Sequence, residues 1–321
     1  MDLKEVKDFL EYFDNVEEVS ENRVHKRCIC DAENPIEFYE DQAFCYRYRF
    51  SKTFVLNVLL PLVANSLDSE PVSPLIQLLT SLRYYATGDF QLVNGDLRGI
   101  SRESVSLIIK NVSEGIARHL RDYIQHPKYL EQKQRNVRLF QAIAGFPGVA
   151  ACVDCMHIKI ANIGDHKEYV FTNRRGIFSL NIQIAVGPQR EMIDIVARYP
   201  GASTDGIIYD RSYLRVACEK GEMGGVLLAD RGYPKKRPNL LTPIVHPASA
   251  RDERFNKAHK GTMEVIERAF GNYKRRFPCL HRGLTTELTT SPAVICATTT
   301  LYNLGLKYKD NITCEEESLE N

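Results

Sequence analysis

The chain has 321 residues, of which 44% are hydrophobic and 26% charged, so it can bury a sizeable core in one large domain or two ordinary ones. Its formal net charge of +1 excludes a global basic field, and nucleic-acid binding would need local patches or a partner. The start of the chain is acidic and amphipathic, unlike a secretory leader, and no apolar run is long enough to span a membrane. Together with nine cysteines, an odd number, these features favour a soluble intracellular protein with reduced thiols.

Residues 1–145 show helical periodicity, which predicts an all-helical N-terminal region. Capping residues stand where helices are expected to begin or end: Ser51, Ser73, Gly88 and Ser101. A short helix, a turn and a second helix in residues 73–125 follow in helix-turn-helix order, which would present Arg102 to DNA. Two ordinary helices of a bundle give the same pattern, so both interpretations remain open at this point.

The pattern changes near residue 145, and the following stretches alternate like strands. Three strands are expected at 148–160, 178–187 and 191–201, the last two joined by a Gly-Pro turn. Further elements are expected in this order: a helix at about 204–220, a short buried strand ending at Asp230, a short strand at 242–245, and helices at about 251–276 and 291–308. This order predicts a mixed α/β layer fold over residues 146–310, followed by an acidic tail at 311–321.

The segment ACVDCMHIKI, residues 151–160, contains a C-x-x-C pattern that is common in metal and redox sites. On a strand, Cys152 and Cys155 point to opposite faces and cannot easily share one ion without a bend. Both are therefore expected to be small buried residues. The notable residue is Asp154, because a carboxylate inside an apolar strand is costly to bury unless it is paired or binds a metal.

Three further carboxylates could join Asp154. Asp230 ends an apolar strand at the carboxyl edge of the sheet, Asp205 opens a helix, and Glu267 lies among apolar neighbours on a long helix. Each has an ordinary explanation taken alone: a turn residue, a partner of the helix dipole, or an exposed ion pair with Arg268. As a set, converging carboxylates repel one another and need a cation, and hard oxygen donors select Mg²⁺ or Mn²⁺. Two such ions would suit the cleavage of a phosphodiester.

Five segments in order carry a resemblance to one family. They are GVAACVDCMHIKI, EYVFTNRRGIFSLNIQIAV, ARYPGASTDGIIYDRSYL, LLADRGYP and MEVIERAFGNYKRRFPCL. They resemble successive blocks of the PIF/Harbinger superfamily of DDE transposases, and in particular its transposase-derived nucleases of animals. The resemblance extends over residues from about 40 to 308.

The resemblance implies an RNase H-like mixed sheet flanked by helices, behind the helical N-terminal region. It matches Asp154, Asp230 and Glu267 to the family's catalytic acids, and Asp205 to a further acid of its metal site. Whether Asp205 or Asp230 is the second catalytic aspartate is left open. Two departures occur: Cys155-Met156 stand where the family often has Gly-Thr, and Arg231 where it often has Ser.

Two histidines and several basic residues complete the candidate site. His157 is expected to face away from Asp154 unless the strand twists, and His259 shares a helix with Glu267, so both are candidates for positions beside the acids. A basic rim would suit a phosphodiester, although a solvated surface gives the same pattern. The candidates for nucleic-acid contact are Arg102, Arg174, Arg175, Lys235, Lys236, Arg237, Lys274, Arg275 and Arg276.

The sequence therefore predicts a DNA endonuclease or transposase that works by a two-metal DDE mechanism with Mg²⁺ or Mn²⁺. The alternative is a domesticated, non-catalytic adaptor in a chromatin or DNA-binding complex. The resemblance further implies a Myb/SANT-like DNA-binding partner and a location in both nucleus and cytoplasm. A homodimer is also expected, because transposases commonly work as dimers.

Overall fold

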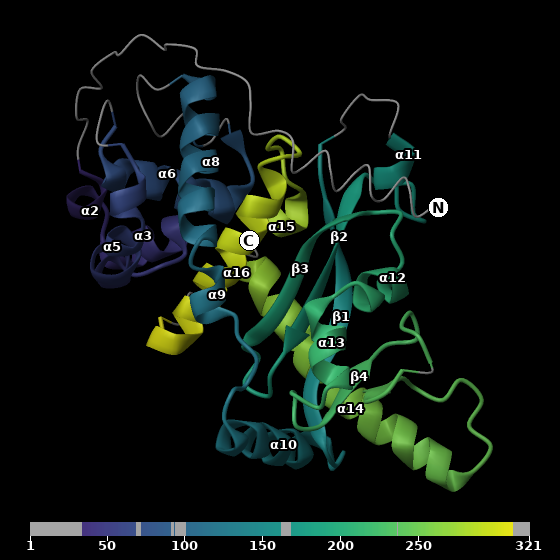
Figure 1. Ribbon diagram of the computed structural model, residues 1–321. Coiled ribbons are helices and arrows are strands. Elements are labelled where there is room, and N and C mark those ends of the chain that lie inside the picture. The colour runs from purple at the N-terminus through teal and green to yellow at the C-terminus, as the bar shows by residue number, and fades with distance from the viewer. Residues whose placement is uncertain are drawn as a thin grey trace, which may run out of the picture.

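The computed structural model describes residues 34–68, 72–90, 93, 101–161, 168–235 and 237–310. A helical region formed mainly by residues 34–123 lies beside a mixed sheet that is flanked by helices (Figure 1). Within these ranges, no helix combines the length and the apolar character needed to cross a membrane.

The N-terminal region is helical, as predicted. Its helices are α2 (Pro35–Phe38), α3 (Asp41–Tyr48), α4 (Lys52–Phe54), a π-helical turn (Val55–Leu59), α5 (Leu60–Val63), a 3₁₀ turn (Ala64–Ser66), α6 (Pro74–Thr87), α8 (Arg102–Ala117), α9 (Leu120–Tyr123) and α10 (Leu130–Ala144). The predicted caps are confirmed: Ser51 and Ser101 accept hydrogen bonds from backbone N–H groups three residues on, and Gly88 adopts a left-handed conformation. The turn of the predicted helix-turn-helix lies in residues 94–100, outside the described residues, so only its second helix, α8, is observed.

The sheet has five strands: β1 (Val149–Lys159), β2 (Ser179–Val186), β3 (Met192–Pro200), β4 (Val226–Ala229) and β5 (Leu240–Leu241). Their spatial order is β3-β2-β1-β4-β5, with β1 antiparallel to β2 and parallel to β4. This mixed sheet is consistent with an RNase H-like fold. The strand predicted at 242–245 is wrong: pairing ends at Leu241, and Pro243 has no N–H to continue a ladder.

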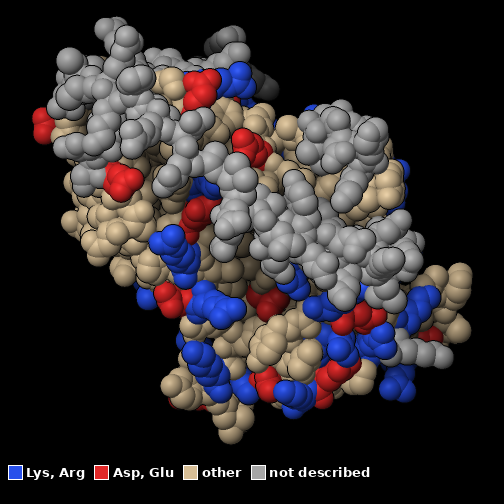
Figure 2. All heavy atoms as spheres, turned by 45° about the horizontal axis from the view of Figure 1, so that its top comes forward, with Lys and Arg blue, Asp and Glu red and all other residues tan. Residues whose placement is uncertain are grey.

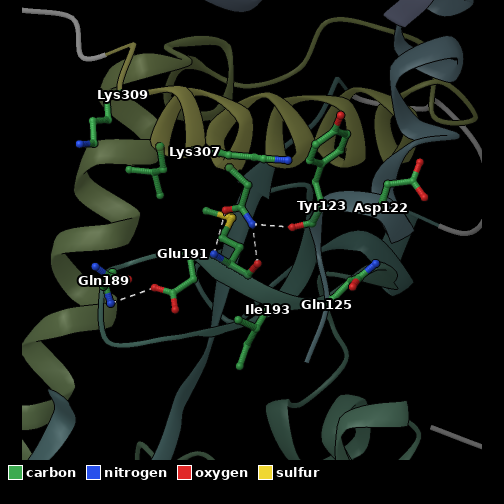
Figure 3. Close-up of a pocket in the computed structure, with 11 residues that line it drawn as sticks. Asp122, Tyr123, Gln125, Gln189, Glu191, Ile193, Lys307 and Lys309 are labelled. Carbon is green, nitrogen blue, oxygen red and sulfur yellow. Dashed lines mark hydrogen bonds between the residues drawn. The ribbon is translucent and has the colours of Figure 1, made fainter. Parts of the chain in front are cut away.

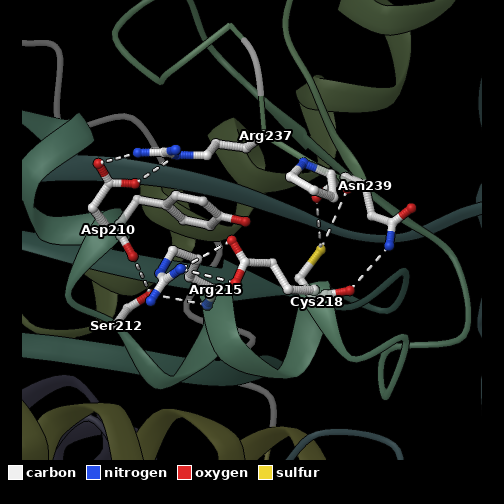
Figure 4. A network of polar contacts seen from close by, with 9 residues as sticks. Asp210, Ser212, Arg215, Cys218, Arg237 and Asn239 are labelled. Atoms are coloured by element: carbon white, nitrogen blue, oxygen red, sulfur yellow. Dashed lines mark hydrogen bonds and ion pairs between the residues drawn. The ribbon is translucent and has the colours of Figure 1, made fainter.

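The remaining helices are α11 (Glu168–Phe171), α12 (Asp205–Asp210), α13 (Tyr213–Glu219), α14 (Ala250–Arg276), α15 (Cys279–Arg282) and α16 (Ser291–Tyr308). The single helix predicted at 204–220 is two helices. The chain turns at Ser212, whose hydroxyl donates to Tyr209 O and accepts from Arg215 N, so it closes α12 and caps α13 (Figure 4).

The two faces of the sheet are covered by different helices. Met156 of β1 belongs to a core cluster with Ile266 of α14, whereas Val153 packs in a second cluster with Leu214 of α13. Strand β2 is buried along its whole length, because helices cover both of its faces. The larger cluster also contains side chains of the N-terminal helices, and α8 packs along α16, so the helical region and the sheet share a core.

Candidate functional site

Asp154 and Asp230 lie at the same level of two neighbouring strands. In the parallel pair of β1 and β4, Val153 lies beside Ala229; Asp154 is the next residue within β1, and Asp230 is the first residue after β4. Because β4 runs parallel to β1 and ends at this level, the residue that follows it comes next to Asp154 in the middle of β1.

The carboxyl group of Asp154 is half-buried and lies near other acids. Burial raises its pKa, and the negative charge of Asp230 raises it further, to about 7. The backbone N–H of Cys155 donates to Asp154 Oδ1 at 2.8 Å and partly offsets this rise. Weaker contributions in the same upward direction come from Asp205 and Glu267. All three other predicted acids therefore act electrostatically on the carboxyl group of Asp154.

Asp205 reaches the same edge from α12, where it is the first residue after the cap Thr204. Asn181 donates from Nδ2 to Asp205 Oδ1 at 3.0 Å, which leaves Oδ2 turned toward Gly232. A Cβ atom added to Gly232 would lie 2.5 Å from Asp205 Oδ2 and 3.0 Å from Asp230 Oδ1. Two carboxylates from separate elements therefore point at one position, and glycine leaves room for both.

Asp230 also has a raised pKa, mainly because of burial and in part because of the charge of Asp205. The N–H of Gly232 donates to its Oδ1 at 2.8 Å and opposes the rise, as do the charges of Arg174 and His259. The backbone turn after β4 thus holds the carboxylate of Asp230 through this hydrogen bond.

Glu267 is the outlying member of the predicted set. It lies on an exposed part of α14 and acts on Asp154 more weakly than the two other aspartates. The ordinary alternative, an ion pair between Glu267 and Arg268, is not formed, because Arg268 instead pairs with Glu264 at 2.9 Å. Glu267 therefore remains available on the side of the sheet that α14 covers.

The donor chemistry fits a hard divalent cation. The converging atoms at Gly232 are carboxylate oxygens, which Mg²⁺ and Mn²⁺ prefer, and their mutual repulsion would be relieved by a bound cation. Within the described ranges, however, no three His, Cys, Asp or Glu side chains approach closely enough to hold a metal ion together. The geometry shown here is a convergence of two carboxylates, with a third beside them on β1.

The two candidate histidines have different surroundings. His259 is buried, its Nε2 contacts Leu241 O at 3.3 Å, and its ring lies against Phe146 and Phe255. Since a carbonyl can only accept, Nε2 carries the proton, and burial lowers the pKa of the ring. His259 thus joins α14 to β5.

His157 is half-buried and pairs with Asn181 of β2. It lies on the opposite face of β1 from Asp154, because side chains three residues apart on a strand point to opposite faces. Its Nδ1 lies 3.0 Å from Ser179 Oγ. Burial lowers its pKa, and the charge of Asp205 acts in the opposite direction. His157 therefore lies on the Asp205 side of the sheet rather than beside Glu267.

Some of the predicted basic side chains pair with acids of the chain, and others are exposed. Arg276 is 11% exposed and pairs with Asp310 at 3.0 Å, so it does not offer its charge to DNA. Arg237 makes a two-pronged bond to Asp210 at 2.8 and 2.9 Å (Figure 4). Lys236 lies outside the described residues. Lys274 is half-buried, and the remaining candidates are exposed: Arg102, Arg174, Arg175, Lys235 and Arg275.

Figure 2 shows one face of the molecule, where basic and acidic side chains are interspersed rather than gathered into one continuous basic field. This mixture agrees with the net charge of +1. Recognition of a polyanion by this chain would therefore depend on particular side chains.

A row of polar residues on β2 belongs to the site although its members were not among the predicted site residues. Ser179, Asn181 and Gln183 alternate with apolar residues, which on a half-exposed strand would simply mark the solvent face. Here all three are buried, and two of them contact His157 or Asp205. Polar residues that alternate along a strand covered on both faces indicate a buried polar site, but only the structure shows that both faces of β2 are covered.

The C-x-x-C pattern is not a metal or redox pair in this structure. Cys152 is fully buried and its thiol faces Thr262 O on α14, whereas the thiol of Cys155 lies 3.2 Å from the hydroxyl of Tyr233. Their partners are on opposite faces of the sheet, as strand geometry predicts.

A separate cavity of about 520 Å³ lies between α9, the β2–β3 turn and the end of α16 (Figure 3). Asn303 bridges Tyr123 O and Met192 O there, and Lys307 Nζ lies 5.3 Å from the centre of the Tyr123 ring. None of the predicted site residues lines this cavity. Its walls are formed by α9, α16 and the β2–β3 hairpin.

Comparison of the sequence with known proteins assigns the chain to a family. Residues 153–303 match the family model described as DDE superfamily endonuclease. The chain is 31% identical over 278 residues to the cattle protein (Bos taurus) named "Putative nuclease HARBI1", an alignment that covers 84% of this chain and 78% of the relative. The human protein (Homo sapiens) of the same name is 30% identical over 277 residues, with the same coverage of both chains.

The chain belongs to the Harbinger transposase-derived DDE endonucleases. This confirms the family predicted from the five segments. The chain is also similar to the Arabidopsis thaliana protein named "Antagonist of Like Heterochromatin Protein 1", at 22% identity over 293 residues, or 83% of this chain and 73% of that protein. No solved structure matches the chain. The match to the DDE superfamily endonuclease model begins at Val153 and therefore includes all four predicted acids.

Proposed function

We propose that this chain is a metal-dependent DNA endonuclease that retains the chemistry of a DDE transposase. The observation that carries the proposal is the convergence of Asp205 and Asp230 at Gly232, beside Asp154 on the adjacent strand. A structural role for such a group is unfavourable, because burial and repulsion raise the pKa of both Asp154 and Asp230. Membership of the DDE endonucleases supports the same reaction.

Each acid has a distinct part in the proposed reaction. Asp154 and Asp230 would hold a divalent cation from adjacent strands, Asp205 would bind from α12, and Glu267 would complete the donor set from α14. When bound, Mg²⁺ or Mn²⁺ supplies the charge that activates a nucleophile and stabilises the leaving oxygen of a phosphodiester. Gly232 leaves space between two of the carboxylates, and Asn181 orients Asp205 by donating to its Oδ1.

DNA binding is proposed to involve the helical region and a partner. Arg102 begins α8 and is exposed, which suits the second helix of a helix-turn-helix that contacts backbone phosphate. Because the net charge is +1, we also propose that a Myb/SANT-like partner supplies sequence recognition and that the complex acts in the nucleus. A homodimer would bring two such sites to the two strands of a duplex.

The decisive experiment compares the wild type with Asp154→Asn on plasmid DNA and on terminal-inverted-repeat DNA, each with Mn²⁺ and with the partner protein added. We expect nicking or cleavage by the wild type only, and none without a divalent cation. Asp122→Asn is the matched control, because Asp122 is a surface carboxylate on α9 that pairs with His119. Equal cleavage by the wild type and Asp154→Asn would disprove the proposed active site.

A second function competes with the first. The Arabidopsis relative is named as an antagonist of a heterochromatin protein, which favours a non-catalytic adaptor in a chromatin complex. Absence of cleavage in every condition above, combined with partner binding that Asp154→Asn leaves intact, would support the adaptor. Thermal shift with Mn²⁺ separates the two further, since an adaptor has no need for a cation.

A further inference from the structure

Two buried amide side chains of β2 lie side by side on one face of the sheet. Asn181 and Gln183 are two residues apart on a regular strand, so they point to the same face. Gln183 lies directly opposite Cys155 of β1 and Val196 of β3. Both of these neighbours pack against the cluster that contains Ile208 of α12. The two amides therefore lie in the layer between the sheet and α12, where Asp205 begins the helix.

The amide of Gln183 is completely buried, and neither its nitrogen nor its oxygen has a hydrogen-bond partner among the described residues. Gln77 shows the usual arrangement for a buried glutamine. It is also buried, and its Nε2 donates to the backbone oxygens of Asp68 and Val72. Taking an amide out of water without replacing its hydrogen bonds is strongly unfavourable. Gln183 is therefore expected to bond to something other than the side chains and backbone around it.

The orientation of the Asn181 amide follows from its contacts. Its Nδ2 lies 2.9 Å from the backbone oxygen of Ser203 and 3.0 Å from Asp205 Oδ1. Because a backbone oxygen can only accept, the nitrogen and not the oxygen of Asn181 faces these two groups. Asn181 Oδ1 is therefore turned away from them, and it is buried without a partner in the described part of the chain, as is Ser203 Oγ.

We propose that Gln183, Asn181 and Ser203 bind at least one ordered water molecule inside the folded protein. One end of the Gln183 amide would bond to the water, and the water would donate to Asn181 Oδ1 and contact Ser203 Oγ. Three hydrogen bonds of this kind are typical of an internal water. Water is favoured over an ion because the three groups are two amides and a hydroxyl, which carry no charge to compensate a buried ion.

The bound water makes Gln183 a positioning residue for Asp205. A water held on Oδ1 fixes the plane of the Asn181 amide, and the other end of that amide donates to Asp205. Asp205 Oδ2 in turn points at the space beside Gly232 where Asp230 also converges. Without the water, the Asn181 amide could turn and release Asp205 from this position. This consequence rests on the proposed function, because it matters only if the carboxylates hold a cation.

The first test detects the water directly. The full chain is labelled with ¹⁵N, and the side-chain amide protons of Gln183 are assigned by comparison with Gln183→Met. We expect a nuclear Overhauser effect between these protons and water. Gln77 is the matched control and should show none, because its buried amide is bonded to backbone oxygens. Absence of the effect at Gln183 would overturn the water site.

The second test measures stability by urea unfolding of Gln183→Met, in which an apolar side chain of similar length replaces the amide. If the amide is bonded to water, the variant loses these bonds and its urea midpoint falls. If the amide is unpaired, the variant removes an unfavourable buried group and its midpoint rises. We expect the midpoint to fall. A midpoint equal to or higher than that of the wild type would overturn the water site.

The third test measures the positioning role by calorimetric titration of Mn²⁺ into the full chain. Gln183→Met should weaken Mn²⁺ binding by about 10-fold, a typical effect of losing a group that orients a metal ligand. Gln77→Met is the control: it removes two hydrogen bonds from α6 and should lower the urea midpoint without changing Mn²⁺ affinity.

The outcomes separate this inference from the proposed function. Wild-type Mn²⁺ affinity in Gln183→Met would overturn the positioning role. Failure of the wild type itself to bind Mn²⁺ would reject the proposed function and the positioning role together. The water site is decided in either case by the amide protons of Gln183 and by the urea midpoint of Gln183→Met.

Discussion

Asp205 and Asp230 direct carboxylate oxygens at the same point, the space that a Cβ atom on Gly232 would fill, although one opens a helix and the other follows a strand. Each is held by a different donor: the amide of Asn181 for Asp205, and the N–H of Gly232 for Asp230. Two anions arranged in this way repel each other, and a cation between them would relieve the repulsion. This relationship leads to the first prediction.

Gly232→Ala should reduce affinity for Mn²⁺ by about 10-fold or more, because its Cβ would displace the tip of Asp205, and changes beside metal ligands typically have effects of this size. The measurement is calorimetric titration of Mn²⁺ into the full chain. Gly206→Ala is the control, since a Cβ there meets Pro234 and the backbone oxygen of Gly232 at ordinary contact distances. Equal Mn²⁺ affinity in Gly232→Ala and the wild type would contradict the assignment.

Asp154 should make metal-free stability fall as pH rises. Its pKa is raised from 3.8 to about 7 in the folded protein, so the folded state binds more protons than the unfolded state between these values. The stabilisation is complete below about pH 4 and is lost as pH passes through 7. The interval from 3.8 to about 7 sets an upper bound of about 4 kcal/mol.

The check is urea unfolding in EDTA at pH 5 and pH 8 for the wild type and Asp154→Asn. The wild type should lose more stability between these values than the variant, in which no carboxyl group titrates at that position. Addition of Mn²⁺ at pH 8 should restore stability to the wild type, because a ligand at 100 times its Kd contributes about 2.7 kcal/mol. Identical pH dependence in both proteins would rule out the raised pKa of Asp154.

Asp310→Ala should destabilise the whole chain by about 3–5 kcal/mol, because it leaves the guanidinium of Arg276 buried and unpaired. Asp310 also accepts from the Ser51 hydroxyl at 2.6 Å, so this carboxylate joins the end of α16 to α4 and α14. The measurement is the urea midpoint. Arg276→Met combined with Asp310→Ala should recover much of the loss; a double variant as unstable as Asp310→Ala alone would contradict this explanation.

The thiols of Cys152 and Cys155 should react slowly with a thiol reagent at neutral pH and should not form a disulfide under mild oxidation. Burial raises the pKa of both, which keeps them as thiols, and their side chains lie on opposite faces of β1. Mass spectrometry of the alkylated, digested protein measures both results. Rapid modification of Cys152 in the folded state would show that β1 is more accessible than its burial indicates.

Much of the architecture could be predicted because it depends on local chemistry. The cap at Ser51, the C-terminal glycine at Gly88 and the helix over residues 291–308 follow from short-range rules, and all were found where predicted. The two elements that were predicted wrongly also have local causes. Ser212 competes for backbone groups and divides one predicted helix into two, and Pro243 ends a predicted strand early.

The candidate site was less predictable, because its residues are related through the sheet. Sequence alone determined the acids, the family and the strand that bears Asp154. The tertiary structure decided that β4 runs parallel beside β1, which brings Asp230 level with Asp154, and that Asn181 and Gly232 orient the carboxylates. It also decided that Arg276 is buried while Arg174 is exposed. Strand pairing and burial are long-range properties, set by which faces pack together, so spacing along one chain cannot specify them.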